Sequence, residues 1–322
     1  MLNKKDILGG VYGLAVGDAL GVPVEFSARE VLDNNPVRNM RGFGTHNQPV
    51  GTWSDDTSLV LATMDAMCAG GLSKGIIMDC FSKWYTEAKY TATGEVFDIG
   101  GTTFRAITNY LTGEALERCG EANEMSNGNG SLMRMLPLVF YTYLNYGVEV
   151  KPVAVNAIYE LSSLTHAHII SKVCCVYYVY IGIYIMVYGE QKGLQEALRE
   201  AVEAVEHYYY VEQEEIPCTL EITGLDSLID CVKLERDEVK STGYVIDSLV
   251  ASIWCLYHTH SYREAVELAV NLGGDTDTIG AITGSLAGIY YGYDKIPKEY
   301  VKSLKGKKLL SGVCDRFYEQ FK

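Results

Sequence analysis

The chain has 322 residues, of which 48% are hydrophobic, and its formal net charge at pH 7 is −14. This length is enough for one large domain or two modest ones with a substantial buried core. The negative charge argues against a basic nucleic-acid-binding surface and against attraction to an anionic membrane, although backbone N–H groups at helix starts can still bind an anionic ligand.

The N-terminal segment MLNKKDILGG lacks the apolar core of a cleavable signal peptide. Asn3 and Asp6 form an N-cap pattern there, and the apolar residues that follow recur with helical spacing. The nine cysteines include no C-x-x-C pair, and most lie in apolar helical runs, which is typical of buried thiols in a reducing compartment. We therefore expect a cytoplasmic protein without a zinc site.

Helical periodicity continues along nearly the whole chain, and almost no run alternates with the period of two that marks a strand. Further helices are predicted near residues 57–69, 73–88, 102–111, 131–145, 151–165, 168–189, 193–209, 242–258, 261–271 and 277–291. The uncharged stretch 173–188 is shorter than the roughly 18–20 residues that span a bilayer, so we interpret it as a buried helix. The acidic region 210–240 is interpreted as a surface excursion. The sequence thus predicts a single all-α domain over residues 1–322.

Five segments next to predicted helices contain more Gly, Asn, Asp and Ser than a turn between helices needs. They are GDALGVPVEF at 17–26, GTWSDDTS at 51–58, VFDIGGTT at 96–103, SNGNGSLMR at 126–134 and NLGGDTDTIG at 271–280. We interpret all five as loops that precede helices at corresponding ends, and this shared placement indicates a common site.

The first box, SDDT at 54–57, consists entirely of residues with oxygen-bearing side chains. Ser, Asp and Thr are preferred helix caps, and acids favour the first turn of a helix. Capping accounts for one aspartate, but Asp55 and Asp56 are adjacent, their charges repel, and only one of them can cap. The second carboxylate therefore needs another explanation.

The second box, GDTDT at 274–278, again has more carboxylates than a cap requires, while Thr276 is assigned to the cap. Gly273 and Gly274 allow close approach of the backbone. Together the boxes supply four carboxylates and several hydroxyls but no His or Cys, a ligand set that suits Mg²⁺ or Mn²⁺. Two divalent ions would neutralise the four charges and activate a water molecule, so the boxes predict a binuclear metal site.

The acids of the segment 17–26 differ in context. Asp18 continues an apolar helical face and is interpreted as a structural acid, whereas Glu25 follows Pro23 on a loop and is free to face a site. In the segment NGNGSLMR at 127–134, small residues ahead of a helix present N–H groups that can hold phosphate, although Asn-Gly is also a common turn signal. Arg134 can pair with a phosphate or with a local acid.

Two histidines occur in SSLTHAH. His166 can donate a hydrogen bond to a ligand or cap the end of a helix, and the sequence favours neither role over the other. His168 is interpreted as structural.

Taken together, the five segments resemble the ADP-ribosylglycohydrolase family, which includes the dinitrogenase reductase-activating glycohydrolases. The resemblance spans nearly the whole chain, from GVYGLAVGDALGVPVEF through LTHA and STGYVIDSL to NLGGDTDTIGAITGSLAGIYYG. The boxes SDDT and GDTDT in this order are its specific part. The fold it implies is an orthogonal all-α helical bundle, which agrees with the helical periodicity.

The resemblance implies a role for each matching position. The expected metal ligands are Ser54, Asp55, Asp56, Asp275, Asp277 and Thr278, with Ser54 standing where many members have Thr. The expected catalytic residues are Glu25, above the metal site, and Asp98, near the scissile bond. The expected substrate contacts are Asn127, Gly128, Asn129, Gly130 and Ser131 around the diphosphate and ribose, His166, and Tyr244 stacked on adenine. Gly101 stands where many relatives have Asn, a departure that bears on the geometry beside Asp98.

The implied activity is hydrolysis of the glycosidic bond between ADP-ribose and a modified protein side chain, arginine first, with two Mg²⁺ or Mn²⁺ ions and release of free ADP-ribose. The alternatives are O-linked serine, small ADP-ribose conjugates, another metal-dependent reaction such as phosphodiester cleavage, or a non-catalytic ADP-ribose-binding relative. The presence of all four box carboxylates argues against the last. The expected partner is an ADP-ribosylated protein or conjugate, and we expect a monomer that binds neither nucleic acid nor membrane.

Overall fold

The computed structural model describes residues 2–212 and 216–322 and confirms the all-α prediction, because no strand occurs in these ranges and only isolated bridges are present. Part of the predicted excursion at 210–240, residues 213–215, lies outside the described residues. The α-helices are α1 (Lys4–Gly21), α2 (Arg29–Asn34), α3 (Asp55–Gly70), α4 (Lys74–Glu87), α5 (Gly101–Leu111), α6 (Leu116–Cys119), α7 (Leu136–Tyr146), α8 (Pro152–Ser163), α9 (Ile169–Lys192), α10 (Leu194–Glu212), α11 (Ile216–Thr223), α12 (Val245–Tyr257), α13 (Tyr262–Val270), α14 (Thr276–Tyr291), α15 (Lys298–Ser303) and α16 (Lys307–Phe321).

Two predicted boundaries differ from the structure. The segment at 17–26 is not a loop throughout, because α1 continues to Gly21 and a short 3-10 helix, Val22–Val24, follows it. The helix predicted at 131–145 is divided into a 3-10 helix, Leu132–Arg134, and α7, which has a proline in its first turn. Proline favours that position because its missing N–H would have no partner there.

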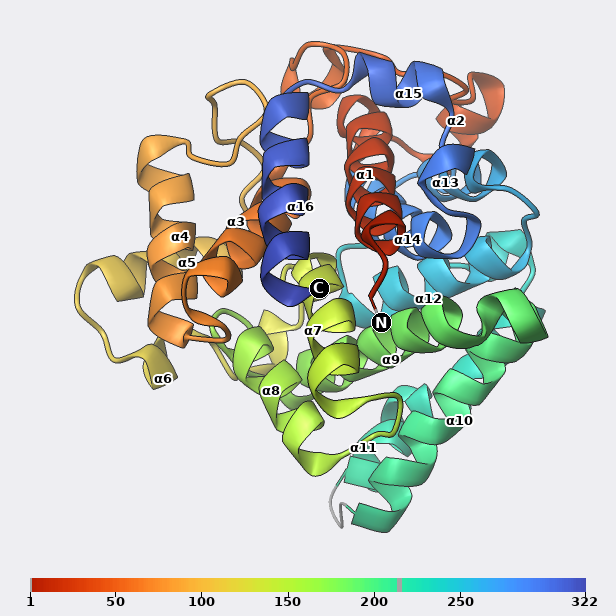
Figure 1. The fold of residues 1–322 in the computed structure, drawn as a ribbon. Coiled ribbons are helices and arrows are strands. Elements are labelled where there is room, and N and C mark those ends of the chain that lie inside the picture. The colour runs from red at the N-terminus through yellow and green to blue at the C-terminus, as the bar shows by residue number, and fades with distance from the viewer. Residues whose placement is uncertain (1, 213–215) are drawn as a thin grey trace.

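Helix α9 crosses the molecule beneath α1 and α14 (Figure 1), and it packs against α7, α8, α10, α12 and α14. The uncharged stretch 173–188 lies within it, and most of its side chains are buried, as predicted. By length and composition, Lys4–Val24 and Ile169–Lys192 are apolar enough to cross a membrane, but 89% and 72% of their most apolar windows are buried in the fold, as in the core helices of soluble proteins.

Helices α1 and α14 form the most extensive helix pair among the described residues and lie side by side in Figure 1. Glycines recur every fourth residue on both helices and face one another, as Gly9 with Gly288, Gly13 with Gly284, and Gly17 with Gly280. A Cβ atom added to any of these glycines would overlap the carbonyl group of its partner. The two backbones therefore touch directly, which requires glycine at each crossing point. Beyond the last crossing, Gly21 lies against the backbone of Asp277.

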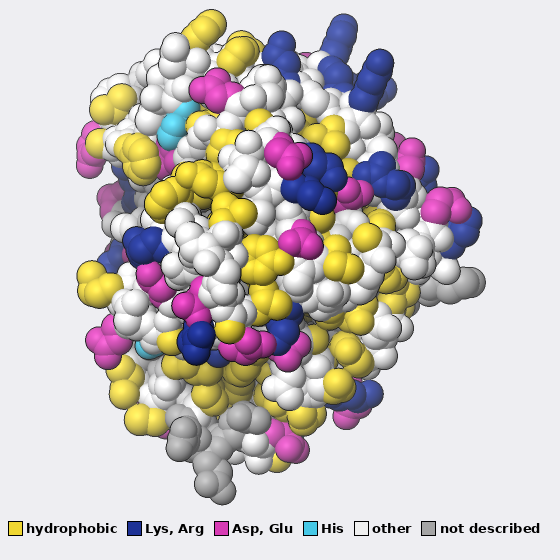
Figure 2. Space-filling view, turned by 90° about the vertical axis from the view of Figure 1, so that its left-hand side faces the viewer, with side chains coloured by type: hydrophobic (Ala, Val, Ile, Leu, Met, Phe, Trp, Pro, Cys, Tyr) yellow, Lys and Arg dark blue, Asp and Glu magenta, His cyan; other side chains and the backbone are white. Residues whose placement is uncertain are grey.

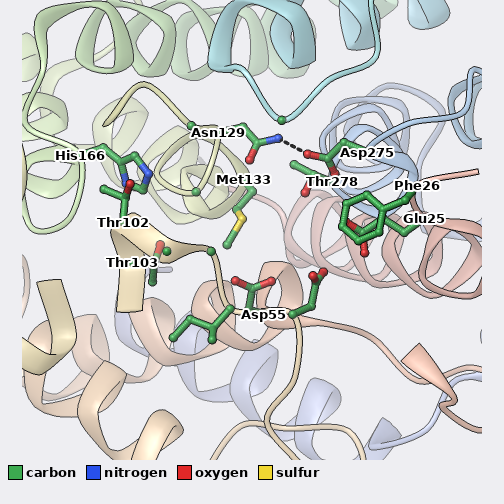
Figure 3. Close-up of a pocket in the computed structure, with 17 residues that line it drawn as sticks. Glu25, Phe26, Asp55, Thr102, Thr103, Asn129, Met133, His166, Asp275 and Thr278 are labelled. Carbon is green, nitrogen blue, oxygen red and sulfur yellow. Dashed lines mark hydrogen bonds between the residues drawn. The ribbon is translucent and has the colours of Figure 1, made fainter. Parts of the chain in front are cut away.

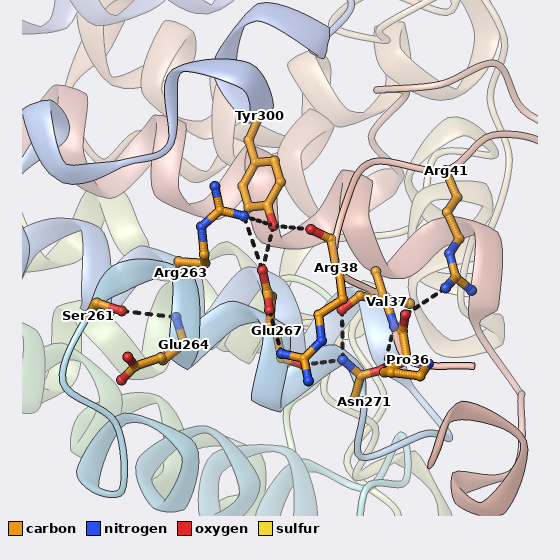
Figure 4. A network of polar contacts seen from close by, with 10 residues as sticks. All are labelled: Pro36, Val37, Arg38, Arg41, Ser261, Arg263, Glu264, Glu267, Asn271 and Tyr300. Atoms are coloured by element: carbon orange, nitrogen blue, oxygen red, sulfur yellow. Dashed lines mark hydrogen bonds and ion pairs between the residues drawn. The ribbon is translucent and has the colours of Figure 1, made fainter. Parts of the chain in front are cut away.

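A polar network fixes the segment that leads from α2 towards α3 (Figure 4). The buried carboxylate of Glu267 accepts hydrogen bonds from the Tyr300 hydroxyl at 2.7 Å, from Arg38 at 3.0 Å and from Arg263 at 3.2 Å. Asn271 pairs with both the N–H and the carbonyl of Val37. These partners come from α13 and α15. The network therefore attaches the segment before residue 43 to the part of the fold that contains α14.

Lysine, arginine, aspartate and glutamate are interspersed on the face shown in Figure 2, so the excess negative charge does not form one continuous patch there.

On α10, Glu206 has a buried Oε1 that lacks a hydrogen-bond partner among the described residues. Burial, and then the charges of Asp226, Glu203 and Asp230, raise its pKa from 4.5 to about 7. The folded state therefore binds this proton more tightly than the unfolded state, and the resulting stabilisation, complete below pH 4.5, is lost as the pH rises towards 7.

We expect Glu206→Gln to raise the melting temperature by roughly 1–3 °C at about pH 8 and by less at about pH 5. Thermal unfolding followed by circular dichroism at both pH values tests this expectation. An equal or larger gain at the lower pH would contradict it.

Candidate functional site

The start of α3 is capped by residues outside the aspartate pair. The Ser54 hydroxyl accepts a hydrogen bond from the Asp56 N–H at 3.3 Å. Asp18 on α1 accepts three more, from the Ser54 N–H at 2.9 Å and from the N–H and hydroxyl of Thr57 at 3.1 and 2.6 Å. Burial raises the pKa of Asp18 to about 7 although these hydrogen bonds oppose the shift. Asp18 thus has the structural role predicted for it, and the carboxylates of Asp55 and Asp56 are left without a capping role.

At the start of α14 no side chain caps the helix, although Asp275 occupies the N-cap position. Its Oδ2 atom accepts a hydrogen bond from the Asn129 side chain at 2.8 Å, while its Oδ1 and both oxygens of Asp277 are buried and lack partners. The assignment of Thr276 to the cap is wrong, because its hydroxyl donates to the Gly21 carbonyl at 2.8 Å and so joins α14 to α1.

The two boxes meet although more than 200 residues separate them in sequence. The Thr278 hydroxyl donates to Asp56 Oδ2 at 3.3 Å, as does the Ser54 hydroxyl at 3.0 Å. Two carboxylate groups gather here with ligand oxygens within 4.8 Å of one another: Asp18, Asp56 and Asp277, and Glu25, Asp275 and Asp277. Asp55 belongs to neither group but lines the adjacent pocket.

Burial, and then mutual repulsion, raise the pKa of Asp55, Asp56 and Asp277 well above the usual range. Buried carboxylates with unpartnered oxygens and like-charged neighbours are costly unless a cation lies between them. The set contains only hard oxygen donors, which suit Mg²⁺ or Mn²⁺. The residues present therefore fit a metal centre of this kind.

A second group of titratable side chains borders these carboxylates. Glu25, buried to 5% exposure, forms a short hydrogen bond with His46 Nε2, and Asp98 Oδ1 lies 3.6 Å from the same nitrogen. Burial, and then the charges of Asp98 and Asp275, raise the pKa of Glu25 to about 7 against the effect of His46. The hydrogen bond to Glu25 in turn raises the pKa of His46. Sequence reasoning missed His46, although a histidine in a Gly- and Pro-containing loop just before the first box was a usable signal.

A pocket of about 350 Å³ opens beside the carboxylates and contains both predicted catalytic residues, Glu25 and Asp98 (Figure 3). Its lining includes no lysine or arginine. Residues Ile99 to Thr103, at the start of α5, form one wall, and no side chain caps this helix. Thr103 is 1% exposed, and its hydroxyl has no partner in the described part of the chain. Uncapped N–H groups and a hydroxyl without a partner are donors of the kind that can hold an anion. Gly101 lies in this wall, and a Cβ atom there would meet the Arg105 guanidinium at 3.1 Å.

The glycine-containing loop at 128–130 forms a second wall, which adjoins the first because a Cβ atom at Gly130 would lie 2.9 Å from the Thr103 hydroxyl. The Asn129 N–H donates to the Gly243 carbonyl at 3.0 Å, and Gly128, Asn129, Gly130 and Gly243 all line the pocket. The His166 ring lies against Gly130, and its Nδ1 is 2.8 Å from the Thr165 hydroxyl, so His166 does not cap a helix. Burial, and then the Arg134 charge, lower the pKa of His166 to about 3, which keeps the ring neutral. His168 accepts a hydrogen bond from the Ile170 N–H and caps α9, as its structural interpretation predicts.

Several predicted substrate contacts lie outside the pocket lining. The Asn127 side-chain N–H donates to the Glu124 carbonyl, its Oδ1 accepts from the Ser171 hydroxyl, and the Ser131 hydroxyl accepts from Ser162. Tyr244 is 38% exposed at the start of α12, next to Gly243. The prediction that these residues bind substrate stays a prediction.

Arg134 forms no ion pair with an acid among the described residues. The residue is fully buried, donates to the Leu161 carbonyl at 3.0 Å and stacks on the Phe81 ring at 4.8 Å, and it does not line the pocket. Two of its guanidinium nitrogens lack partners among the described residues. Burial holds its pKa below the usual range, at about 10.

A model of the ADP-ribosylglycohydrolase family matches residues 2–322. The chain belongs to this family. Similar proteins include the ADP-ribosylarginine hydrolase Tri1 of Serratia proteamaculans, 29% identical over 318 residues that cover 96% of this chain and 78% of the relative. The ADP-ribosyl-[dinitrogen reductase] glycohydrolase of Rhodospirillum rubrum is 28% identical over 93% of this chain and 90% of the relative. The fold of this family member also resembles a solved structure described as an ADP-ribosylglycohydrolase-related protein complex, with a TM-score of 0.75, 28% identity and 99% coverage of both chains.

Proposed function

We propose that the protein hydrolyses the glycosidic bond between ADP-ribose and a modified protein side chain and releases free ADP-ribose. Among the modified side chains, we propose arginine first. One observation carries the proposal: the buried, unpartnered carboxylates of the two boxes meet at one end of a pocket whose walls are an uncapped helix start and a glycine loop. Family membership and the printed names of the similar hydrolases support the same reaction.

The two walls of the pocket indicate where each part of the substrate binds in this proposal. The N–H groups at the start of α5 and the Thr103 hydroxyl suit the diphosphate, because both donate hydrogen bonds and no pocket carboxylate comes from that helix. Neutral His166, which lies close to Thr103 and Gly130, suits a hydrogen bond to the ligand at the same end of the pocket. The ribose that carries the scissile bond then extends towards Glu25, Asp98 and the boxes.

The residues proposed to hold two Mg²⁺ or Mn²⁺ ions are Ser54, Asp55, Asp56, Asp275, Asp277 and Thr278. In such a cage, divalent ions supply charge neutralisation and activation of water at neutral pH. The Asn129 amide holds Asp275, and Thr278 holds Asp56, so the cage is oriented by its own hydrogen bonds.

Glu25 and Asp98 are proposed to handle the protons. In the hydrolysis the bond between the anomeric carbon and the side-chain nitrogen breaks, water oxygen bonds to that carbon, and the leaving nitrogen gains a proton. Glu25 is proposed to accept a proton from water, because its carboxylate lines the pocket beside the carboxylates of the second box. His46, hydrogen-bonded to Glu25, fixes the orientation of its carboxylate.

Product analysis tests the proposal. The protein is incubated with arginine-, serine- and glutamate-linked ADP-ribose in the presence of Mg²⁺, of Mn²⁺ or of a chelator. We expect free ADP-ribose from the arginine conjugate with either ion and at least a roughly 100-fold loss with chelator, since metal-assisted hydrolysis depends on several kcal/mol of charge stabilisation. AMP plus ribose phosphate would instead indicate phosphodiester cleavage. Binding of ADP-ribose without turnover of any conjugate would indicate a non-catalytic relative.

A cytoplasmic location is part of the same proposal, because none of the nine cysteines forms a disulfide and most are buried.

A further inference from the structure

Phe26 combines two features that rarely occur together in an aromatic residue. Its side chain is 70% exposed, and its backbone φ angle is +61°, in the left-handed region that bulky residues avoid. It lines the pocket directly after Glu25, and Figure 3 shows its ring beside that carboxylate, on the other side of the pocket from His166. Folding alone favours neither the conformation nor the exposure, and such residues cluster at functional sites.

The backbone of this segment is held by hydrogen bonds, whereas the ring is mostly exposed and its ring contact is with His46. The Phe26 N–H donates to the Gly274 carbonyl at 2.7 Å, and the Gly274 N–H donates to the Ser27 carbonyl at 2.9 Å. Arg29, three residues on, donates to the carbonyls of Leu272, Arg236 and Val239. The loop is thereby fixed to the second box, so the backbone of Phe26 keeps a constant place beside the carboxylates.

The charges around the ring favour a cation. Glu25 and Asp98 share a single histidine neighbour, His46, and no lysine or arginine lines the pocket, so acids outnumber bases around Phe26. His46, with its ring centre 6.3 Å from that of Phe26, is already paired with Glu25. The face of an aromatic ring attracts cations, and the planar guanidinium group stacks on it especially well.

We propose that Phe26 is the specificity-determining residue for the leaving side chain: its ring stacks on the guanidinium group of ADP-ribosylated arginine and favours that group over a neutral hydroxyl such as serine. The assignment rests on the proposed function. It places the leaving group at the end of the pocket away from His166 and from the wall that suits the diphosphate. The ring orients the group as it departs, without taking part in proton transfer.

The test compares Phe26→Leu and Phe26→Trp with wild type on arginine-linked and serine-linked ADP-ribose. Leucine keeps much of the apolar contact but has no ring face, whereas tryptophan keeps the face. We expect Phe26→Leu to raise KM for the arginine conjugate about 5- to 30-fold and to leave kcat/KM for the serine conjugate within about twofold. We expect Phe26→Trp to retain the wild-type preference. Equal losses on both substrates with Phe26→Leu, or no loss on either, would overturn the proposal.

Phe43 supplies a matched control. It is also an exposed phenylalanine with positive φ, at 58% exposure and +66°, but it does not line the pocket. Phe43→Leu should leave both kinetic constants unchanged. If Phe43→Leu changed the preference for the arginine conjugate as much as Phe26→Leu does, the assignment would also be overturned.

Thermal stability provides a second readout, because a purely structural role of Phe26 predicts the opposite change in melting temperature. Glycine adopts the left-handed region freely, and the Phe26 ring buries little surface. Phe26→Gly should therefore melt at or above the wild-type temperature while losing the preference for arginine. A clear drop in melting temperature would show that the ring serves the fold.

The outcomes for wild type separate this inference from the proposed function. If wild type releases ADP-ribose from no conjugate, the proposed function fails. If wild type prefers the arginine conjugate and Phe26→Leu keeps that preference, only the role of Phe26 fails.

Discussion

Asp277→Asn is expected to reduce the release of ADP-ribose at least about 1,000-fold, which corresponds to roughly 4 kcal/mol of lost transition-state stabilisation. Asp277 is fully buried, belongs to both carboxylate groups of the site, and has no hydrogen-bond partner for either oxygen among the described residues. Asparagine keeps the shape of the side chain but removes the charge that binds a divalent ion. Asp55→Asn should act in the same direction. Steady-state kinetics on an ADP-ribosylated arginine substrate measures the effect.

Thermal unfolding distinguishes this loss from misfolding. Without metal, Asp277→Asn should melt no lower than wild type, because it removes one of several buried, mutually repelling carboxylates. Added Mg²⁺ or Mn²⁺ should raise the melting temperature of wild type but not of the variant. Asp294→Asn makes the same change of charge at an exposed position and should leave both readouts unchanged. Wild-type activity in Asp277→Asn would contradict the metal-site assignment.

Gly17→Ala is expected to destabilise the fold by about 3 kcal/mol or more, because overpacking normally costs 1–3 kcal/mol and the added methyl group here meets backbone rather than a movable side chain. The new Cβ atom would overlap the Gly280 carbonyl, and α1 and α14 would have to separate. Because Asp18 and Asp277 lie next to this contact, activity should fall together with stability. Denaturant unfolding gives the free energy of unfolding.

Gly75→Ala is the matched control for this substitution. Gly75 lies in the first turn of α4, and a Cβ atom there would meet nothing within 4 Å. Alanine should therefore have a neutral effect or stabilise the protein by up to about 1 kcal/mol. If Gly17→Ala and Gly75→Ala behaved alike, the direct backbone contact of α1 and α14 would be refuted.

The local sequence pattern predicted the helices well wherever that pattern was strong. The Asn3–Asp6 cap begins α1 as expected, and the apolar stretch at 173–188 lies inside α9. The helix boundaries at the loops were less predictable. The Asp18 carboxylate caps α3 and not a turn within its own segment. Helix α1 therefore continues through a segment whose composition is typical of a loop. The four-residue glycine repeat was visible in the sequence at Gly9, Gly13, Gly17 and Gly21, but only the structure identifies its partner.

The composition of the sequence predicted the chemistry of the site better than it predicted the geometry of the site. Surplus carboxylates at two helix starts predicted that the boxes belong together, and the structure brings them within hydrogen-bonding distance through Thr278 and Asp56. His46 and Thr103 were missed because each is a single ordinary residue whose position depends on long-range packing. Arg134 was misread for the converse reason: a charged residue beside a glycine loop suggests a ligand, whereas tertiary packing buries it against Phe81.

The glycine contacts of α1 and α14 also limit how the two helices can slide. Each crossing places a residue without a side chain against a carbonyl, so a displacement by one or two residues brings side chains into the backbone of the other helix. The next alignment that matches glycine with glycine lies four residues along, a step of about 6 Å. Asp18 and Asp277 therefore have one permitted spacing and no nearby alternative. Small thermal displacements cannot gradually widen the site, and its geometry persists until the helices separate.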